Sequence, residues 1–157
     1  DIVVMNCYAP MFVNVNAGAR QWRPNLIGYD GLRVYGSPSY HAIKMFSTYL
    51  GDEILHATAT DTEVLVSATR DSRSGAIYVK LVNANSAETA VRIDLQGMQD
   101  VGSTATAVTL AGDPKATNSI DVPQAVAPVT SKISGVTSGF VYHVPAASIV
   151  VLVLNSR

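Results

Sequence analysis

The side chains best suited to chemistry lie in one polar segment near the N-terminus, just after an apolar run. Asn14, Asn16, Arg20, Trp22 and Asn25 fall close together in this segment. Asparagine amides exchange hydrogen bonds with hydroxyl groups, and an indole ring offers a flat apolar face. The combination predicts sugar binding, with Asn14 and Trp22 as the candidate substrate-binding residues. The alternative is that Trp22 packs the segment against its own domain while the asparagines shape turns.

The acidic side chains show no arrangement for acid–base catalysis. Most lie in turns or on the polar side of an alternating strand, where a solvated surface role is expected. None lies in an apolar setting that would raise a carboxyl pKa for proton donation. Asp30 precedes Gly31, and a hairpin turn accounts for that pair. We therefore predict no catalytic residue in this chain.

Metal and cofactor chemistry is not indicated either. His41, His56 and His143 stand singly, without two-ligand helical spacing and without cysteine partners. Cys7 is the only cysteine and is expected to be a small buried side chain in a strand. The sequence has no nucleophile-elbow motif and no glycine-rich phosphate loop. We predict no metal site and no cofactor.

Charge and hydropathy limit the possible partners. The 11 basic and 12 acidic residues give a net charge of −1 and are spread along the chain. No basic stripe exists to neutralise phosphates, so nucleic acid is not expected as a partner. No apolar run reaches the ~18–20 residues that cross a bilayer, so no membrane contact is expected. Hydrophobic residues make up 48% of the chain and charged ones 15%, which favours a packed core.

The candidate residues belong to a strand–loop–helix unit in residues 1–52. Ile2–Ala9 is nearly all apolar, as expected for a parallel strand buried on both faces, and Pro10 should end it. Because a parallel strand needs neighbours on both edges, we expect this unit to pack against a partner chain, the β half or another copy.

A helix is predicted at the end of this unit. Ser37 is a suitable N-cap, Pro38 fits the first helical position, and Gly51 should end the helix. Its apolar stripe consists of residues at three- and four-residue steps: Tyr40, Ile43, Phe46, Tyr49 and Leu50.

Residues 53–157 resemble an all-β domain in their pattern. Short runs rich in Val, Ile, Thr and Tyr alternate with turn clusters, which predicts a jelly-roll or Greek-key β-sandwich and a mainly β fold class. Ile149–Leu154 is apolar on both faces and should be a central strand, and Asp113–Ser131 should be a long loop. The predicted strands are Glu63–Thr69, Ala76–Asn83, Thr89–Leu95, Thr104–Leu110, Phe140–Val144 and Ser148–Leu154.

Several motifs carry a resemblance to a known family. They are Tyr8-Ala9-Pro10-Met11-Phe12-Val13-Asn14, Trp22-Arg23-Pro24-Asn25-Leu26-Ile27, Tyr35-Gly36-Ser37-Pro38-Ser39-Tyr40, Met45-Phe46-Ser47, Val79-Lys80-Leu81-Val82-Asn83, Asn118-Ser119 and Pro145-Ala146-Ala147-Ser148-Ile149. In this order and spacing they are similar to the α-L-arabinofuranosidases of glycoside hydrolase family 51. The resemblance implies that residues 1–52 are the last strand, loop and helix of a (β/α)8 catalytic barrel, and that residues 53–157 are a C-terminal β-sandwich domain.

The resemblance also implies an activity for the whole enzyme. Such enzymes remove terminal α-L-arabinofuranosyl groups from arabinan or arabinoxylan with retention, using two glutamates about 5–5.5 Å apart. Both glutamates lie on earlier barrel strands, and Glu53, Glu63 and Glu88 have no place in that pattern. Many members place a sugar-binding glutamine where this chain has Pro10, which is a departure. Because neither catalytic glutamate has a counterpart in this chain, we expect the chain alone to be inactive.

The implied partners are the rest of the barrel and, through the complete enzyme, an arabinose-containing polysaccharide or oligosaccharide. A homo-oligomer and a secreted or periplasmic location are also expected. Two alternatives remain: a carbohydrate-binding or structural sandwich module without catalysis, and an immunoglobulin-type interaction domain, which would leave the strand–loop–helix unit unexplained.

Overall fold

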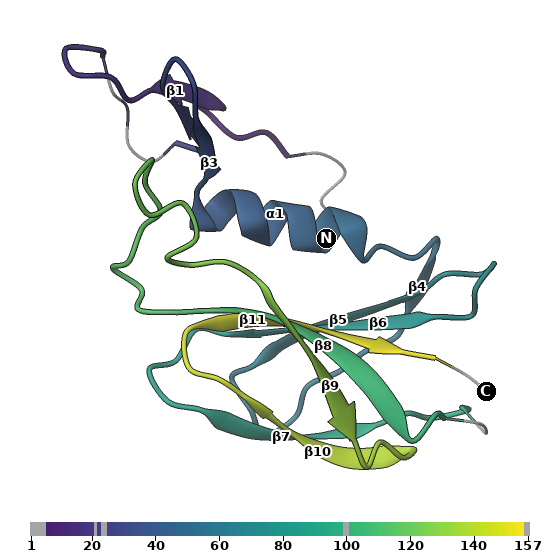
Figure 1. Ribbon diagram of the computed structural model, residues 1–157. Coiled ribbons are helices and arrows are strands. Elements are labelled where there is room, and N and C mark those ends of the chain that lie inside the picture. The colour runs from purple at the N-terminus through teal and green to yellow at the C-terminus, as the bar shows by residue number, and fades with distance from the viewer. Residues whose placement is uncertain (1–5, 21, 23–24, 99–100, 156–157) are drawn as a thin grey trace.

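The computed structural model describes residues 6–20, 22, 25–98 and 101–155. Most of the chain forms a β-sandwich, with one helix along its outer face (Figure 1). The elements are β1 (Phe12–Asn14), β2 (Ile27–Tyr29), β3 (Val34–Gly36), α1 (Pro38–Thr48), β4 (Glu53–Leu55), β5 (Leu65–Arg70), β6 (Ile77–Asn83), β7 (Thr89–Asp94), β8 (Thr104–Ala111), β9 (Val129–Ser134), β10 (Gly139–Val144) and β11 (Ser148–Leu154). Beyond the helix's N-terminal end lies a three-stranded sheet of β1, β2 and β3, called the small sheet below.

The sandwich consists of a six-stranded sheet, in the order β4-β5-β6-β11-β8-β9, and a two-stranded sheet of β10 and β7. Neighbouring strands in both sheets are antiparallel. The chain leaves the six-stranded sheet after β9 and forms β10 in the two-stranded sheet. It then returns as β11 beside β8, as the fourth strand of a Greek key does. The mainly β class and the β-sandwich predicted from the sequence are confirmed.

The larger apolar core lies between the two sheets. Val150, Leu152 and Leu154 of β11 are 0% exposed and belong to it. They share this core with Leu81 of β6 and Phe140 of β10. Full burial of one such side chain contributes about 1.5–3 kcal/mol, so this core holds the two sheets together.

The opposite face of the six-stranded sheet is covered by helix α1. Met45 of the helix is 3% exposed and shares a second core with Val151 of β11, while the rings of Tyr49 and Tyr78 meet with centroids 5.9 Å apart. Successive residues of β11 therefore point into two different cores. This explains why Ile149–Leu154 is apolar on both faces, and its predicted central position is confirmed.

All six strands predicted in the β half are present, with ends that differ by one or two residues at most. Two edge strands, β4 and β9, were not predicted, and the predicted loop over Asp113–Ser131 runs into the start of β9. In β9 only Ile133 is even half-buried. The strand thus lacks the apolar alternation that identifies a strand in a sequence.

The strand predicted over Ile2–Ala9 is wrong where it can be compared. Residues 2–5 lie outside the described residues, and residues 6–9 form no strand. Cys7, expected to be buried, is exposed. A parallel strand forms only beside partners, and no described strand runs alongside residues 6–9. The strand that does form is β1, which begins after Pro10 and pairs in parallel with β2.

Helix α1 begins as predicted but ends earlier. Ser37 is the N-cap, its hydroxyl accepts a backbone N–H of the first turn at 3.2 Å, and Pro38 follows it. The last helical residue is Thr48, so Gly51 does not end the helix. Gly51 is instead required by a close approach of the chain to β5, because a Cβ there would lie 2.2 Å from the carbonyl oxygen of Arg70.

The apolar stripe predicted for this helix is only partly its buried face. The sandwich buries the face that carries Met45 and Tyr49, whereas Ile43, Phe46 and Leu50 are 39%, 37% and 61% exposed. Phe46 still contacts the sandwich at the edge of that face, because the ammonium of Lys80 in β6 lies 5.2 Å from its ring centroid. The expectation that this unit packs against the β half is confirmed for that face.

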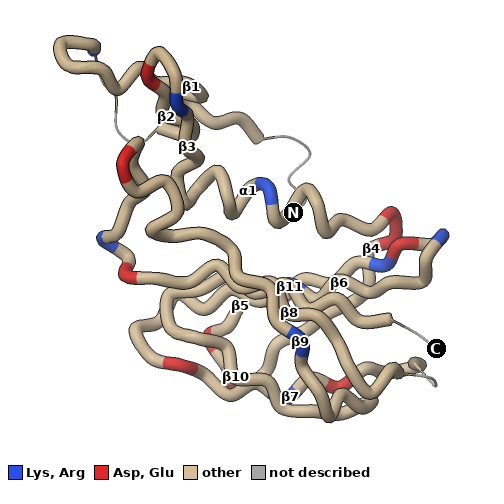
Figure 2. The backbone as a smooth tube through the Cα atoms, viewed as in Figure 1, with Lys and Arg blue, Asp and Glu red and all other residues tan. Residues whose placement is uncertain are grey.

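Charged residues are scattered along the backbone, and several lie near a residue of opposite charge (Figure 2). Arg70 pairs with Glu53 at 2.7 Å, and Arg92 pairs with Asp94 at 3.0 Å. These pairs are solvent-exposed and contribute roughly 0–1 kcal/mol each. Within the described residues, no helix combines the length and the apolar character needed to cross a membrane.

Candidate functional site

The candidate residues lie where the chain leaves the small sheet. Asn14 is the last residue of β1, and Trp22 lies between β1 and β2, in the loop of residues 15–26, of which residues 15–20, 22, 25 and 26 are described. β1 is parallel to β2, and β2 is antiparallel to β3. Val13 is 4% exposed and fixes β1 in the small sheet, while Asn14 beside it is half-buried.

Asn14 shapes the start of the loop through its side-chain oxygen. Oδ1 accepts the backbone N–H of Asn16 at 3.0 Å, a turn that asparagine commonly makes. Gly18, with φ of +81°, continues the loop in a conformation that other residues rarely adopt. The Asn14 amide nitrogen has no hydrogen-bond partner among the described residues, so its two N–H groups can donate to a ligand oxygen. The turn-forming and ligand-binding roles of Asn14 are therefore compatible.

Trp22 presents its ring to solvent, with an exposed fraction of 57%. The guanidinium of Arg20 lies 5.3 Å from the ring centroid, within cation–π range. An exposed indole held beside a cation offers apolar area to one face of a sugar ring. The alternative packing role for Trp22 would need a surface outside the described residues.

Unlike Trp22, the side chains of Asn25 and His41 each have a buried polar atom. The Nδ2 of Asn25 and the Nε2 of His41 are buried, and neither has a hydrogen-bond partner in the described part of the chain. Burial lowers the pKa of His41 from its ordinary value because the charged form is poorly solvated there, and the nearby Lys44 charge adds to this. Neither side chain is placed to reach a ligand from solvent.

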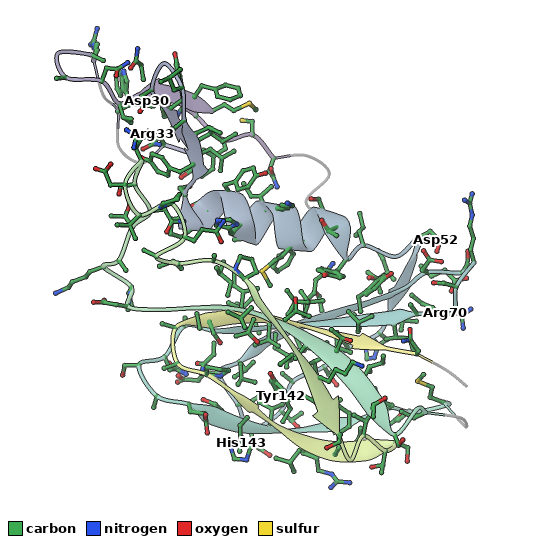
Figure 3. The ribbon with its side chains drawn as sticks, viewed as in Figure 1. Asp30, Arg33, Asp52, Arg70, Tyr142 and His143 are labelled. Carbon is green, nitrogen blue, oxygen red and sulfur yellow. The ribbon has the colours of Figure 1, made fainter. Side chains whose placement is uncertain are left out.

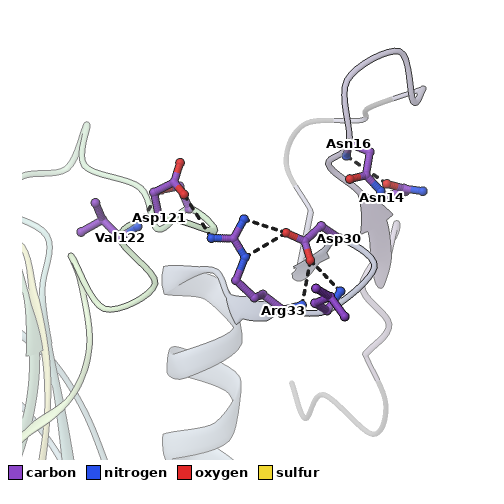
Figure 4. Close-up of polar contacts among 8 residues, drawn as sticks. Asn14, Asn16, Asp30, Arg33, Asp121 and Val122 are labelled. Atoms are coloured by element: carbon purple, nitrogen blue, oxygen red, sulfur yellow. Dashed lines mark hydrogen bonds and ion pairs between the residues drawn. The ribbon is translucent and has the colours of Figure 1, made fainter.

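Asp30 closes the β2–β3 turn, as the Asp-Gly pair predicted. Its Oδ1 accepts the backbone N–H groups of Leu32 and Arg33 at 2.8 and 2.7 Å, and its Oδ2 lies 2.8 Å from the Arg33 guanidinium. The N–H of Leu32 is the first cause of the lowered pKa of Asp30, followed by the N–H of Arg33. Arg33 also reaches Asp121 at 3.3 Å, which links this turn to the β8–β9 loop (Figure 4).

Asn118 makes a second link between the small sheet and the β8–β9 loop. It is 2% exposed, and its Nδ2 donates to the carbonyl oxygens of Gly36 at 2.8 Å and Val126 at 2.9 Å. Its Oδ1 accepts the N–H of Val126 at 2.7 Å. Sequence reasoning gave Asn118 no role, and the only indication was the Asn118-Ser119 motif in the family resemblance. Gly36 lies 82 residues away along the chain, so the contact has no local pattern.

The glutamates do not form a catalytic pair. Glu53 is paired with Arg70, Glu88 lies 3.0 Å from His143, and Glu63 is exposed. These residues come from different parts of the sandwich, and the labelled side chains of Figure 3 show Arg70 and His143 well apart. Among the described residues, no three His, Cys, Asp or Glu side chains are grouped so as to hold a metal ion.

The aspartates with displaced pKa values are shifted in the wrong direction for proton donation. The pKa of Asp52 is lowered mainly by the hydroxyl of Ser72, and that of Asp71 mainly by the backbone N–H of Ser74. A general acid needs a raised pKa at neutral pH. Asp30, Asp52 and Asp71 are therefore carboxylates that close turns.

Sequence comparison relates this chain to one family. A family model described as the α-L-arabinofuranosidase C-terminal domain matches residues 1–148. A probable α-L-arabinofuranosidase A of Aspergillus terreus is 33% identical over 157 residues, which is 99% of this chain and 24% of that protein. An extracellular exo-α-L-arabinofuranosidase of Streptomyces chartreusis is 48% identical over 90 residues, which is 57% of this chain and 10% of that protein.

Structural comparison gives the same relationship. The arabinose-bound MgGH51 α-L-arabinofuranosidase superposes with a TM-score of 0.87 at 35% identity, covering 96% of this chain and 24% of that one. The chain thus spans about a quarter of the length of the relatives that it matches almost from end to end.

Proposed function

This chain belongs to the α-L-arabinofuranosidase C-terminal domain family, and we propose that it forms the C-terminal part of a retaining enzyme that removes terminal α-L-arabinofuranosyl groups from arabinose-containing plant polysaccharides. The observation that carries the proposal is the match of 96% of the chain to an arabinose-bound α-L-arabinofuranosidase, with a TM-score of 0.87. Arabinan and arabinoxylan are the proposed polymers. The complete enzyme, meaning the whole protein of which this chain is the C-terminal part, carries the activity.

Within that enzyme the two halves of the chain have different roles. Residues 1–52 supply the last strand, loop and helix of the catalytic barrel, and residues 53–157 form the supporting sandwich. One carboxylic acid protonates the leaving oxygen while a second carboxylate attacks the sugar carbon, and both come from the remainder of the barrel. The loop of residues 15–26 lines the substrate pocket, where Asn14 donates hydrogen bonds and Trp22 stacks on the sugar.

The distribution of exposed apolar side chains supports this division. Among the described residues, most of the large apolar side chains that are exposed lie between residues 11 and 54. Apart from Trp22, they lie in or beside the three-stranded sheet, the helix and β4: Met11, Phe12, Tyr29, Leu32, Val34, Ile43, Phe46, Leu50 and Ile54. A surface with so much apolar area normally contacts another protein surface. We propose that the rest of the barrel covers it.

A sandwich that binds polysaccharide by itself is less well supported. Phe140 is 8% exposed, and Tyr78 and Tyr142 are half-buried against the two cores, so none is an open platform for sugar stacking. A groove of about 1050 Å³ opens between the sheets beside β5 and β7. Its lining, over the described residues, includes no Trp, Tyr or Phe. Polymer degradation outside the cell fits a secreted or periplasmic enzyme, and the Streptomyces relative is named extracellular.

The complete enzyme is expected to hydrolyse an aryl α-L-arabinofuranoside, because its proposed pocket recognises the terminal sugar and not the leaving group. NMR of the first-formed product should show arabinose that retains the α configuration, as a double displacement requires. Release of aryl alcohol from an aryl β-D-xyloside but not from the arabinofuranoside would contradict the proposed substrate. A first product of β configuration would contradict the retaining mechanism.

Replacement of Trp22 or Asn14 by alanine in the complete enzyme is expected to raise KM by about tenfold, since buried aromatic and hydrogen-bonding contacts of this kind are commonly worth more than ~1 kcal/mol. Steady-state kinetics on the aryl arabinofuranoside measure the change. Val141→Ala is a suitable control, because Val141 is 56% exposed on β10, in the two-stranded sheet of the sandwich and away from β1. If both variants keep the kinetics of the unaltered enzyme, these residues do not contact the substrate.

A further inference from the structure

The small sheet is joined to the sandwich by a series of hydrogen bonds that starts at Asn118. The Asn118 amide donates to the carbonyl oxygen of Gly36, the last residue of β3, at 2.8 Å. The next residue, Ser37, donates its N–H to the carbonyl oxygen of Leu26 at 2.9 Å. Leu26 in turn donates its N–H to the carbonyl oxygen of Pro10 at 3.2 Å. The bonds thus run from the sandwich to Leu26, the last residue of the loop of residues 15–26, and on to Pro10 just ahead of β1.

The contact at Gly36 has little freedom to shift. A Cβ at Gly36 would lie 2.2 Å from the ring of Tyr40, so the backbone here is pressed against the first turn of α1. Asn118 itself is 2% exposed, and both its amide oxygen and its amide nitrogen are bonded. Loss of this side chain would leave the half-buried carbonyl of Gly36 without its Asn118 donor, and the Oδ1 partner of Val126 would be lost as well.

The neighbouring ion pair cannot replace this link. Arg33 and Asp121 also join the two parts, at 3.3 Å, but their side chains are 58% and 86% exposed. Such a pair is screened by water and salt and constrains position weakly. The buried amide is therefore the contact that fixes where the β3–α1 junction lies.

We propose that Asn118 is a positioning residue for substrate binding, through which the sandwich sets the position of the loop of residues 15–26. This inference rests on the proposed function, in which Asn14 and Trp22 of that loop region contact the sugar. It gives the sandwich a defined part in binding, because a displaced loop would weaken the contacts that Asn14 and Trp22 make with the sugar while the reacting carboxylates stay in place.

Asn83 offers a matched control for Asn118. It is 1% exposed, its Nδ2 faces the carbonyl oxygens of Val144 and Pro145 at 3.2 and 3.0 Å, and its Oδ1 accepts the N–H of Asn85 at 3.0 Å. These partners lie at the end of β10 and in turns of the sandwich, not in the three-stranded sheet. Asn83→Ala removes the same side chain from an equally buried place, so it reproduces the loss of stability without the loss of the link.

The first test needs no activity. Hydrogen exchange of the backbone amides of Leu26 and Ser37 is measured in the complete enzyme for Asn118→Ala and Asn83→Ala. Because local opening governs exchange, we expect roughly tenfold faster exchange at these two amides in Asn118→Ala, beyond any change common to the whole sandwich. Equal acceleration of all amides in both variants would overturn the inference.

The second test uses the complete enzyme. Asn118→Ala is expected to raise KM for the aryl arabinofuranoside about tenfold while kcat changes less than about threefold, since the catalytic carboxylates stand elsewhere. Asn83→Ala should leave KM unchanged. A KM that is unaltered in Asn118→Ala despite faster exchange would also overturn the inference, because the loop would then be anchored but not used. Absence of all arabinofuranosidase activity in the unaltered enzyme would refute the proposed function instead, and the exchange result would remain interpretable.

Discussion

The purified chain is expected to leave an aryl α-L-arabinofuranoside intact, releasing aryl alcohol no faster than buffer does. The complete enzyme should accelerate the same reaction by at least about 10⁶-fold, the lower end of the range for enzymes. Retaining hydrolysis needs two carboxyl groups about 5–5.5 Å apart on either side of one sugar carbon. The three glutamates of this chain lie at separate places on the sandwich, where Glu53 forms an ion pair with Arg70 and Glu88 lies 3.0 Å from a ring nitrogen of His143.

The electrostatics of the chain lead to the same expectation. The acid in a retaining glycosidase stays protonated near neutral pH because its surroundings raise its pKa. Asp30, Asp52 and Asp71 instead have lowered pKa values, since backbone N–H groups and serine hydroxyls stabilise their charged forms. None of these three can hold a proton for a leaving group at neutral pH.

The control for this experiment is the complete enzyme at equal molarity, assayed in the same buffer and over the same time. Turnover by the chain alone, at a rate proportional to its concentration, would show that a carboxyl assigned here to the surface is catalytic. Amide substitutions of the glutamates, one at a time, would then identify it. Activity that disappears on further purification would point to a contaminating glycosidase.

Sequence reasoning succeeded where burial imposes a pattern on consecutive residues. The six predicted strands of the sandwich have one face in a core, so β-branched and apolar residues recur at a period that marks them. β4 and β9 were not predicted, because edge strands bury few side chains. In β9 only Ile133 is half-buried. The helix start was predictable since a Ser-Pro pair acts locally, but its end at Thr48 and the role of Gly51 depend on contacts with β5.

The residue types of the candidate site can be picked out from the sequence, and their role in binding stays a prediction, whereas the contacts that support them cannot be picked out. Asn14 and Trp22 stand out because polar and aromatic residues follow a strand end, where ligands commonly bind. Asn118 does not stand out, since its bond to Gly36 joins positions 82 residues apart and one asparagine in a loop resembles any other. The apolar run of residues 2–9 misled at residues 6–9, which form no strand, because such a run indicates burial but does not say which partner provides it.

Replacement of Leu152 by alanine is expected to lower the free energy of unfolding by about 3–5 kcal/mol. Leu152 is 0% exposed in the central strand β11, where it pairs with Val79 of β6 on one side and Ala107 of β8 on the other. Removal of a buried leucine costs the lost transfer energy plus a term for the cavity left behind. Ala107 is too small to fill that space, and strands held on both edges cannot close over it, which places the expected effect in the upper part of the range.

Urea denaturation of the chain measures this change, with the slope of the transition showing whether the unfolding reaction stays the same. Leu65→Ala is the matched control, because Leu65 lies in β5 of the same sheet but is 68% exposed, and it should change the stability by less than about 0.5 kcal/mol. A loss below about 1 kcal/mol for Leu152→Ala would mean that the space between the two sheets is loosely packed or filled by water. The sandwich could not then be the rigid support on which the positioning of the substrate loop depends.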